Sequence, residues 1–216
     1  MVSRTSPSEN REYLISKTLS KLLRHRAGSP DLPIDENGYV SVNHLLAHND
    51  LKCKKATLED IKRVVETNDK RRFAFSQDGS SVCALQGHSI SLVNTTPGMQ
   101  LLDPKLDKDW PKNLLHGTYE NKLTMIQSTG GLSRMKRNHV HFTSIIPPQF
   151  SNSTFKNVPI SGVRNSCNVL IFLDITKIRN STLPFYKSAN NVYLTPGDEN
   201  GIVSSDYFLK IVYKEK

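Results

Sequence analysis

The first part of the chain carries apolar residues at helical spacing. Between residues 12 and 26 they fall on one side of a helix that turns by about 100° per residue, together with one threonine. The predicted inner positions are Leu14, Ile15, Thr18, Leu19, Leu22 and Leu23. On the same wheel Arg24 points away from this stripe and His25 lies at its edge, so we expect Arg24 to be exposed. Gly28 is typical of the residue that ends such a helix.

A turn at residues 35–38 leads into a short strand at Tyr39 and Val40, and a second helix is predicted over residues 42–47. A third helix begins near Thr57, whose side chain can cap it, with Asp60 three residues further on. The predicted inner face of this helix consists of Leu58, Ile61, Val64 and Val65.

A β-hairpin follows the third helix. Phe73 and Phe75 alternate with other residues, Asp78-Gly79 forms the turn, and residues 82–85 return. Three helices followed by a hairpin is the element order of a winged-helix module. Such modules usually bind nucleic acid, although many bind only protein.

Strands dominate the second part of the chain, where a single short helix is predicted at residues 120–128. The continuous apolar run at residues 168–175 is typical of a buried strand. The other predicted strands lie at residues 114–118, 139–143, 192–194 and 207–213. We therefore expect an α+β protein whose second lobe has a strand-rich core.

The pattern breaks in the polar Asn-Thr-Thr-Pro-Gly segment, which predicts a linker at residues 94–100. The predicted lobes are residues 1–93 and residues 101–216. Residues 1–11 lack an apolar signal core, so we expect a short mobile tail there.

The charge of the chain favours an anionic partner. Lys and Arg number 29 against 20 Asp and Glu, which gives a net charge of +9. This excess indicates nucleic acid before membrane, although a basic composition can also serve solubility alone. The sequence has no apolar run of about 20 residues that would span a bilayer.

Cys53, Cys83 and Cys167 are widely spaced and never form a CxxC pair, which argues against a disulfide framework or a thiolate zinc site. We therefore expect the protein to reside in a reducing compartment, the cytoplasm or the nucleus or both. Separately, we expect it to be a monomer. His44 and His48 stand four apart like a metal pair, but HExxH would need Glu at position 45, which is Leu45. The sequence therefore predicts no metal.

No common nucleotide-binding or hydrolase motif is present: GxGxxG after a strand, GxxxxGK[ST] and GxSxG are all missing. The basic groups at residues 24–26, 71–72 and 134–137 each allow a structural interpretation. Cations in a last helical turn complement the helix dipole, and the other two groups can be solvated loops.

Eight segments, in order over residues 12–212, resemble the tRNA 2′-phosphotransferase family. The segments of the first lobe are LSKLLRH (19–25), DENGYVSVNHLL (35–46), DKRRF (69–73) and QGHS (86–89). Those of the second lobe are LLHGTY (114–119), GGLSRMKRNHVHFT (130–143), GVRNSCNVLIFLDI (162–175) and NVYLTPG (191–197). The resemblance implies an N-terminal winged-helix RNA-binding lobe and a C-terminal ADP-ribosyltransferase-like lobe that binds NAD in a cleft.

The resemblance also implies a set of site residues. The catalytic constellation maps onto Arg24, His25, Arg72 and Arg137, with Arg137 serving the phosphates across the cleft. Arg71 also precedes the phenylalanine of DKRRF, so the choice between Arg71 and Arg72 stays open. The implied RNA-phosphate contacts are Arg24, His25, Arg71, Arg72 and His88. The implied NAD-binding residues are His116, Gly117, Thr118, His139, His141 and Thr143.

The chain departs from the family pattern at two places. QGHS usually follows Ile-Arg-Ala, but here it follows Val82-Cys83-Ala84 and Leu85, so an arginine contact is missing. Many ADP-ribosyltransferases have a glutamate where this chain reads Val192-Tyr193-Leu194. A phosphate monoester is largely dianionic at neutral pH and needs no base, which makes this second departure intelligible.

The function that the resemblance implies is the last step of tRNA splicing: transfer of an internal 2′-phosphate from tRNA to NAD. The products are RNA with a 2′-hydroxyl, ADP-ribose 1″,2″-cyclic phosphate and nicotinamide, formed through a 2′-phospho-ADP-ribosylated RNA. Two alternatives belong to other classes: a winged-helix nucleic-acid-binding protein without catalysis, and an ADP-ribosyltransferase that stops at the capped product.

Overall fold

The computed structural model describes residues 7–150 and 160–214. The chain divides into two compact units, residues Met1–Pro97 and Gly98–Lys216, and each unit has its own apolar core. Both units contain helices and strands, which confirms the α+β class predicted from the sequence.

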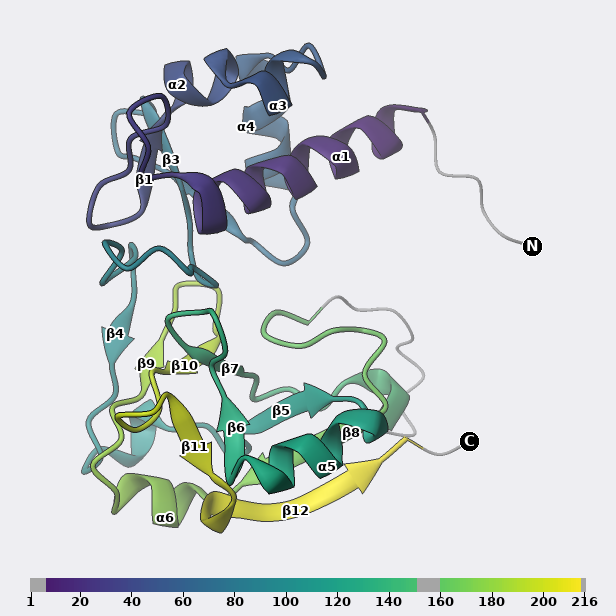
Figure 1. Cartoon of the computed structure of the whole chain (residues 1–216), viewed down its shortest axis with the longest axis vertical. Helices are drawn as coiled ribbons and strands as arrows, with labels where there is room; N and C mark the ends of the chain where they lie inside the picture. Colours follow the sequence, from purple (N-terminus) through teal and green to yellow (C-terminus); the bar gives the residue numbers. More distant parts are fainter. Residues whose placement is uncertain (1–6, 151–159, 215–216) are drawn as a thin grey trace. The chain divides into compact units, whose positions relative to one another are not determined.

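Helices form most of the first unit (Figure 1). They are α1 (Pro7–Lys21), a π-helical turn η1 (Leu22–Arg26), α2 (Val42–Ala47), α3 (Asn49–Lys52) and α4 (Leu58–Thr67). Helix α1 packs against α3 and α4. Ile15 and Leu19 of α1 and Leu22 and Leu23 of η1 are fully buried in the core of this unit, as the apolar stripe predicts.

Helix α1 corrects two predictions. Leu14 is 43% exposed, because on a helical wheel it lies about 100° away from Ile15 and so falls outside the covered face. The predicted tail is wrong for residues 7–11, since α1 already begins at Pro7, while residues 1–6 lie outside the described residues. Proline suits a first helical turn, and the Arg11 side chain bonds the carboxylate of Asp60 on α4.

Helix α4 begins as its sequence predicts. The Thr57 hydroxyl accepts from the Asp60 backbone N–H, and the Asp60 carboxylate accepts from the Thr57 N–H, which completes a capping box. Ile61 and Val64 are buried, whereas Leu58 at the first helical position is exposed, contrary to the prediction. The short helix α3 was not predicted.

The predicted hairpin is present as β2 (Phe73–Phe75) and β3 (Ser81–Ala84), joined by a turn in which Gly79 N–H donates to the Ser76 carbonyl. Strand β1 (Tyr39–Ser41) pairs with the other side of β3, giving an antiparallel sheet of order β1-β3-β2. The segment that follows β3 therefore leaves the central strand of this sheet.

Strands dominate the second unit (Figure 1). They are β4 (Gln100–Leu101), β5 (Leu115–Thr118), β6 (Gly131–Ser133), β7 (Val140–Phe142), β8 (Val169–Leu173), β9 (Tyr186–Lys187), β10 (Tyr193–Thr195), β11 (Ile202–Ser204) and β12 (Phe208–Tyr213). The helices are α5 (Glu120–Ser128) and α6 (Ile175–Arg179), with 3₁₀ turns at Asp107–Asp109, Pro148–Phe150 and Ser205–Tyr207.

Two antiparallel sheets carry the segments of interest. One has the order β12-β8-β5 and the other β4-β9-β10-β7, with a separate β11-β6 pair. A bridge between Leu115 and Thr143 connects the start of β5 to the residue after β7. This bridge places His116 of β5 beside the strand that contains His141.

The apolar run at residues 168–175 forms β8 only as far as Leu173. Asp174 then caps α6 by accepting from the Lys177 N–H, so the predicted strand is too long at its end. No helix in residues 7–150 or 160–214 is both long and apolar enough to cross a membrane. Cys53, Cys83 and Cys167 are thiols rather than disulfide partners.

Candidate functional site

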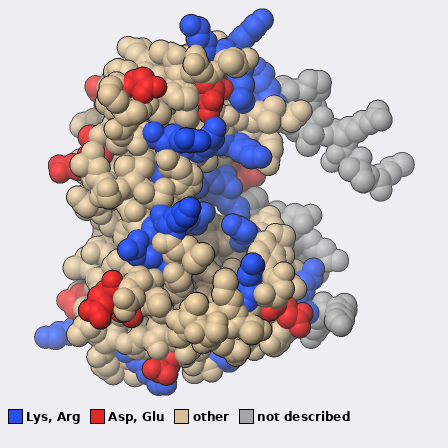
Figure 2. Space-filling view, viewed as in Figure 1, with Lys and Arg blue, Asp and Glu red and all other residues tan. Residues whose placement is uncertain are grey.

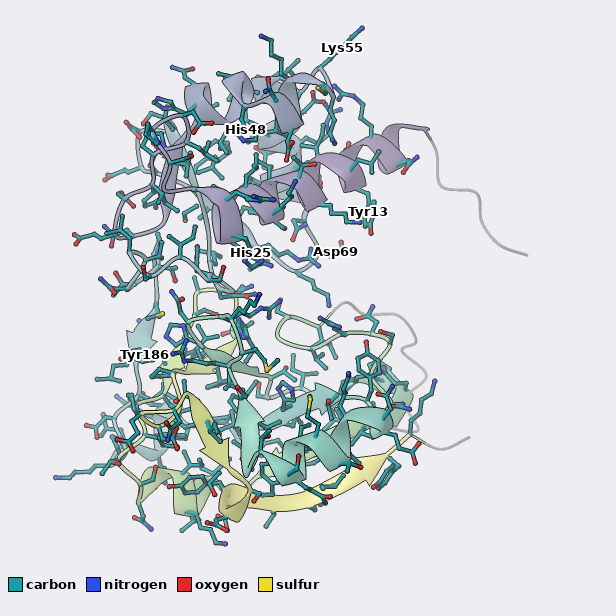
Figure 3. The ribbon with its side chains drawn as sticks, in the orientation of Figure 1. Tyr13, His25, His48, Lys55, Asp69 and Tyr186 are labelled. Atoms are coloured by element: carbon teal, nitrogen blue, oxygen red, sulfur yellow. The ribbon has the colours of Figure 1, made fainter. Side chains whose placement is uncertain are left out.

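The end of the first helix is a π turn that contains Arg24 and His25. The Ala27 N–H donates to the Leu22 carbonyl at 2.9 Å, five residues back, which defines this wider turn. Insertions of this kind are frequent at functional sites because they re-aim side chains. His25 is exposed at this end of the helix, as Figure 3 shows.

The prediction that Arg24 is exposed is wrong, because its Nε and Nη2 atoms are buried. The guanidinium lies over Gly87, where a Cβ would stand 3.3 Å from Nε and 3.4 Å from Cζ. Gly87 has a φ of +92°, which favours glycine, and its lack of a side chain leaves room for the arginine to pack closely against the backbone. Arg24 is thus packed against QGHS rather than free in solvent.

Residues 85–89, which follow β3, are bonded to both arginine-bearing segments of the first unit. The Leu85 N–H donates to the Arg72 carbonyl at 2.8 Å, and the Ser89 N–H donates to the Arg24 carbonyl at 2.9 Å. The Ser89 Oγ is also 2.9 Å from the His25 Nδ1. One segment therefore bonds to the backbone of both Arg24 and Arg72 and to the ring of His25. We name these three residues the first-unit group.

The structure treats the two neighbouring arginines differently. Arg71 is exposed with a φ of +43°, whereas Arg72 is half-buried. The Asn68 Oδ1 accepts from both the backbone N and the Nη1 of Arg72, each at 3.1 Å. Burial lowers the pKa of Arg72, and the charge of Asp69 opposes this shift. Arg72 is the arginine that the fold holds in place.

The remaining QGHS positions are buried. His88 is 4% exposed, and a Cβ on Gly38 would lie 3.2 Å from its Nε2. The predicted contact of His88 with RNA stays a prediction. Cys83, at the position where an arginine is usual, is also buried, and burial raises the pKa of its thiol to about 12 beside Tyr39.

In the second unit His116 is fixed by a backbone bond. Its Nδ1 lies 2.8 Å from the His141 carbonyl, which can only accept, so Nδ1 has the proton. Burial lowers the pKa of His116, and the positive charges of Arg137 and Arg164 lower it further. The ring stands edge-on to Phe142 with centroids 5.9 Å apart. The surroundings of His116 therefore disfavour its protonated form.

Arg137 is half-buried, and burial together with the charge of Arg164 lowers its pKa. The Arg134 Nη1 donates to the Arg137 carbonyl at 2.9 Å, and the Arg134 N–H donates to the Gly201 carbonyl. These bonds fix the turn between β6 and β7 that contains Arg137. We name His116, Arg137 and Arg164 the second-unit group.

The other predicted NAD-binding positions are mostly internal. Thr118, His141 and Thr143 are buried, and Val163 and Cys167 occupy the space beside Gly117 where a side chain would stand. His139 is half-buried and contacts the ring of Tyr186 edge-on, with centroids 5.9 Å apart. His116 and His139 thus retain exposed surface.

Comparison with known proteins shows the family of the chain. The model of the RNA 2′-phosphotransferase, Tpt1 / KptA family matches residues 10–197. The chain belongs to this family.

Relatives of the family match over most of their length. The chain is 36% identical over 205 residues to tRNA 2′-phosphotransferase 1 of Danio rerio, which covers 93% of this chain and 85% of that protein. It is 41% identical over 192 residues to the tRNA 2′-phosphotransferase of Saccharomyces cerevisiae, which covers 87% of this chain and 80% of that protein. A probable RNA 2′-phosphotransferase of Rhodopirellula baltica is 35% identical over 179 residues, covering 83% and 88%.

Three residues that belong to the two groups or bond to them were not predicted from the sequence: Arg164, Ser89 and Asn68. Arg164 lies in the GVRNSCN segment, so the family resemblance already contained that signal. Ser89 ends the QGHS segment, but its bond to His25, 64 residues away along the chain, gave no sequence signal. Asn68 lies directly before DKRRF, and its bond to Arg72, four residues on, was not predicted.

The two histidines that resemble a metal pair are placed differently. His44 is exposed on α2, whereas the His48 Nδ1 accepts from the Asp50 N–H and caps α3. Among residues 7–150 and 160–214, no three His, Cys, Asp or Glu side chains gather as a metal site would need.

Lys and Arg side chains gather in patches on the face seen in Figure 2, whereas Asp and Glu are spread singly over it.

Proposed function

We propose that this protein removes the internal 2′-phosphate of tRNA by transferring it to NAD, with the chemistry set out above. In this proposal the first unit is a winged-helix lobe that binds RNA, and the second is an ADP-ribosyltransferase-like lobe that binds NAD. The family membership supports the removal of the 2′-phosphate, and the two positively charged groups support the assignment of roles.

The observation that carries the proposal is the arrangement of the first-unit group. Arg24 and Arg72 are partly buried and are held by bonds to the same five-residue segment, together with His25. Partly buried guanidinium groups bind a phosphate more strongly than freely moving surface charges, because less solvent competes and less entropy is lost. Such a group suits recognition of a phosphate rather than of a base sequence.

The second-unit group fits NAD. The charged residues that lower the pKa of His116 are both arginines, Arg137 and Arg164, so the surroundings favour the anionic diphosphate of NAD. When bound, NAD supplies the ribose carbon that accepts the phosphate and the neighbouring hydroxyl that later displaces the RNA. The fixed ring of His116 and the half-buried ring of His139 would orient it.

The residues of the chain have separate tasks in the two steps. In the first step Arg24 and Arg72 hold the dianionic RNA phosphate in line with its target, and no general base is required. In the second step negative charge develops on phosphoryl oxygens, and Arg137 stabilises it. His25 donates a proton to the departing RNA oxygen.

A nicotinamide-release assay tests this function. An RNA oligonucleotide with one internal 2′-phosphate should release nicotinamide from NAD and lose its phosphate, whereas the same oligonucleotide with a 2′-hydroxyl should do neither. Binding without nicotinamide release would favour the non-catalytic nucleic-acid-binding alternative. Release that ends with a stable RNA adduct would favour the transferase that stops at the capped product.

A further inference from the structure

Ser89 makes three contacts with the π turn that the proposed mechanism does not use. Its backbone N–H donates to the Arg24 carbonyl at 2.9 Å. Its hydroxyl lies 2.9 Å from the His25 Nδ1 and 3.4 Å from the same Arg24 carbonyl. One side chain therefore stands between the ring of His25 and a backbone acceptor.

We propose that Ser89 is a positioning residue that keeps the proton of His25 on Nδ1. This inference rests on the proposed function, in which His25 is the proton donor, because it explains how the His25 ring is oriented for that role. The Ser89 side chain acts through His25 and does not touch the substrate.

The hydrogen-bond inventory of the three groups supports this assignment. The Arg24 carbonyl can only accept, and a serine hydroxyl has a single hydrogen. When that hydrogen points at the carbonyl, the Ser89 Oγ can only accept from His25, so the His25 Nδ1 must donate. The chain of donors then runs from the ring through the hydroxyl to the carbonyl.

This arrangement suits a general acid. The Nδ1–H bond to Ser89 is present whether His25 is neutral or positively charged, so the ring need not rotate between the two states. The proton that leaves is then the one on Nε2: it passes to the departing RNA oxygen, and the N–H electron pair stays on the ring. A ring whose neutral form has the proton on Nε2 would have to exchange protons before it could act again.

The same segment also holds the π turn through contacts that do not involve the Ser89 hydroxyl. The Ser89 N–H bond to Arg24 and the packing of Gly87 under the guanidinium do not involve the hydroxyl. A Ser89→Ala variant therefore removes the contact with His25 and keeps the backbone contacts of residues 85–89. This separation makes the side chain testable.

The tautomer of His25 can be read directly by nitrogen NMR of protein with ¹⁵N-labelled histidine, using His25→Gln to assign its signals. We expect wild-type protein at neutral pH to show a protonated Nδ1 and an unprotonated Nε2. Ser89→Ala should move the ring towards the Nε2–H form, and Ser89→Thr, which keeps a hydroxyl, should restore the wild-type pattern. Ser91→Ala is the matched control, since Ser91 is exposed in the same loop.

The kinetic expectation follows from the loss of one hydrogen bond. The rate of the adduct-resolving step should fall roughly tenfold in Ser89→Ala, with little change in the rate of adduct formation. Ser89→Thr should recover most of this loss, and Ser91→Ala should match the wild type.

Two results would overturn the inference: a wild-type His25 with its proton on Nε2, or a Ser89→Ala protein whose His25 tautomer is unchanged. Neither depends on turnover. Failure of the wild-type protein to use NAD would instead overturn the proposed function, and the NMR result would still decide the role of Ser89.

Discussion

Asp60 is a buried carboxylate that joins the first helix to the fourth. It is 4% exposed, and its Oδ1 accepts from Arg11 and from Arg63. Its Oδ2 accepts from the backbone N–H and the hydroxyl of Thr57, each at 2.9 Å. The Arg11 hydrogen bond, followed by the bonds from Thr57, outweighs burial and lowers the pKa of Asp60 from 3.8 to about 2. The charge is therefore part of how α1 is held.

The lowered pKa predicts how stability depends on pH. A carboxylate whose folded pKa lies below its unfolded pKa stabilises the fold above the unfolded value and loses this effect as pH falls. We expect Asp60→Asn to lower the free energy of unfolding near neutral pH by on the order of 2 kcal/mol. The variant should also lose less stability than the wild type between pH 3.8 and about 2.

Urea unfolding across this pH range measures the effect, with Glu59→Gln as the control because Glu59 is an exposed neighbour. Equal loss of stability in the wild type and in Asp60→Asn over this range would show that the Asp60 charge is not what holds α1.

Arg71 and Arg72 are neighbours in the chain, but their substitutions should affect activity differently. Arg72 is bonded to Asn68 and half-buried, whereas Arg71 is exposed. Arg72→Ala should reduce kcat/KM for phosphorylated RNA on the order of a hundredfold, as expected for loss of one preorganised donor. Arg71→Ala should remain within about threefold, a loss near that of an ordinary surface position.

Circular dichroism must show both arginine variants folded for this comparison to count. If Arg71→Ala is the more damaged variant, the substrate contact belongs to Arg71. If Arg72→Ala unfolds instead, Arg72 is a structural residue and its functional assignment is wrong.

At the scale of elements, local signals predicted local structure well. The capping box at Thr57, the turn at Asp78-Gly79 and the helix at residues 120–128 all need only neighbouring residues, and each is confirmed. The π turn was missed, because a helical wheel assumes a constant rotation per residue. The two-residue strands β4 and β9 were missed because they exist only through pairing with each other and with β10.

The residues of the candidate site could be predicted only in part from the sequence. Family segments supplied Arg24, His25, Arg72 and Arg137, and Arg164 was within reach of the same comparison. The burial of Arg24 could not be predicted, because it depends on packing against Gly87, which is far away in the sequence.

Gly87 tests the contact between residues 85–89 and the π turn. Gly87→Ala adds a Cβ that would stand 3.3 Å from the Arg24 Nε, at a φ of +92°. We expect a loss of stability of about 1–3 kcal/mol from backbone strain, and a raised KM for phosphorylated RNA because the guanidinium must move.

Gly79→Ala is a matched control, since Gly79 has a φ of +72° with nothing within 4 Å of its added Cβ. It should lose stability without a change in KM. Equal changes in KM for the two variants would mean that strain, and not displacement of Arg24, is responsible.

At the scale of the whole molecule, the proposal divides the reaction between the two units. The first unit contributes His25 and the half-buried Arg72, and the second contributes His116 and the half-buried Arg137. The charge of Arg164 lowers the pKa values of both His116 and Arg137. The first step starts from a nucleophile that is already charged and a leaving group, nicotinamide, that departs neutral. The second step must attack a phosphodiester anion and expel an RNA oxygen, so it depends more on charge stabilisation and proton donation.

This division predicts which variants accumulate the RNA adduct. Arg137→Ala and His25→Ala should build up RNA heavier by one ADP-ribose unit, because they slow resolution more than formation. His116→Ala should impair NAD binding and build up none. Gel mobility and mass of the RNA after a single turnover distinguish these cases, and accumulation only in His116→Ala would reverse the roles.

The most direct test of the central claim follows the phosphate itself. An RNA labelled with ³²P only at its internal 2′-phosphate is incubated with the protein and a chelator, with or without NAD. The account predicts that, only with NAD, the label moves to ADP-ribose 1″,2″-cyclic phosphate and the RNA is left with a 2′-hydroxyl. Label released as inorganic phosphate without NAD, or label that never leaves the RNA, would contradict it.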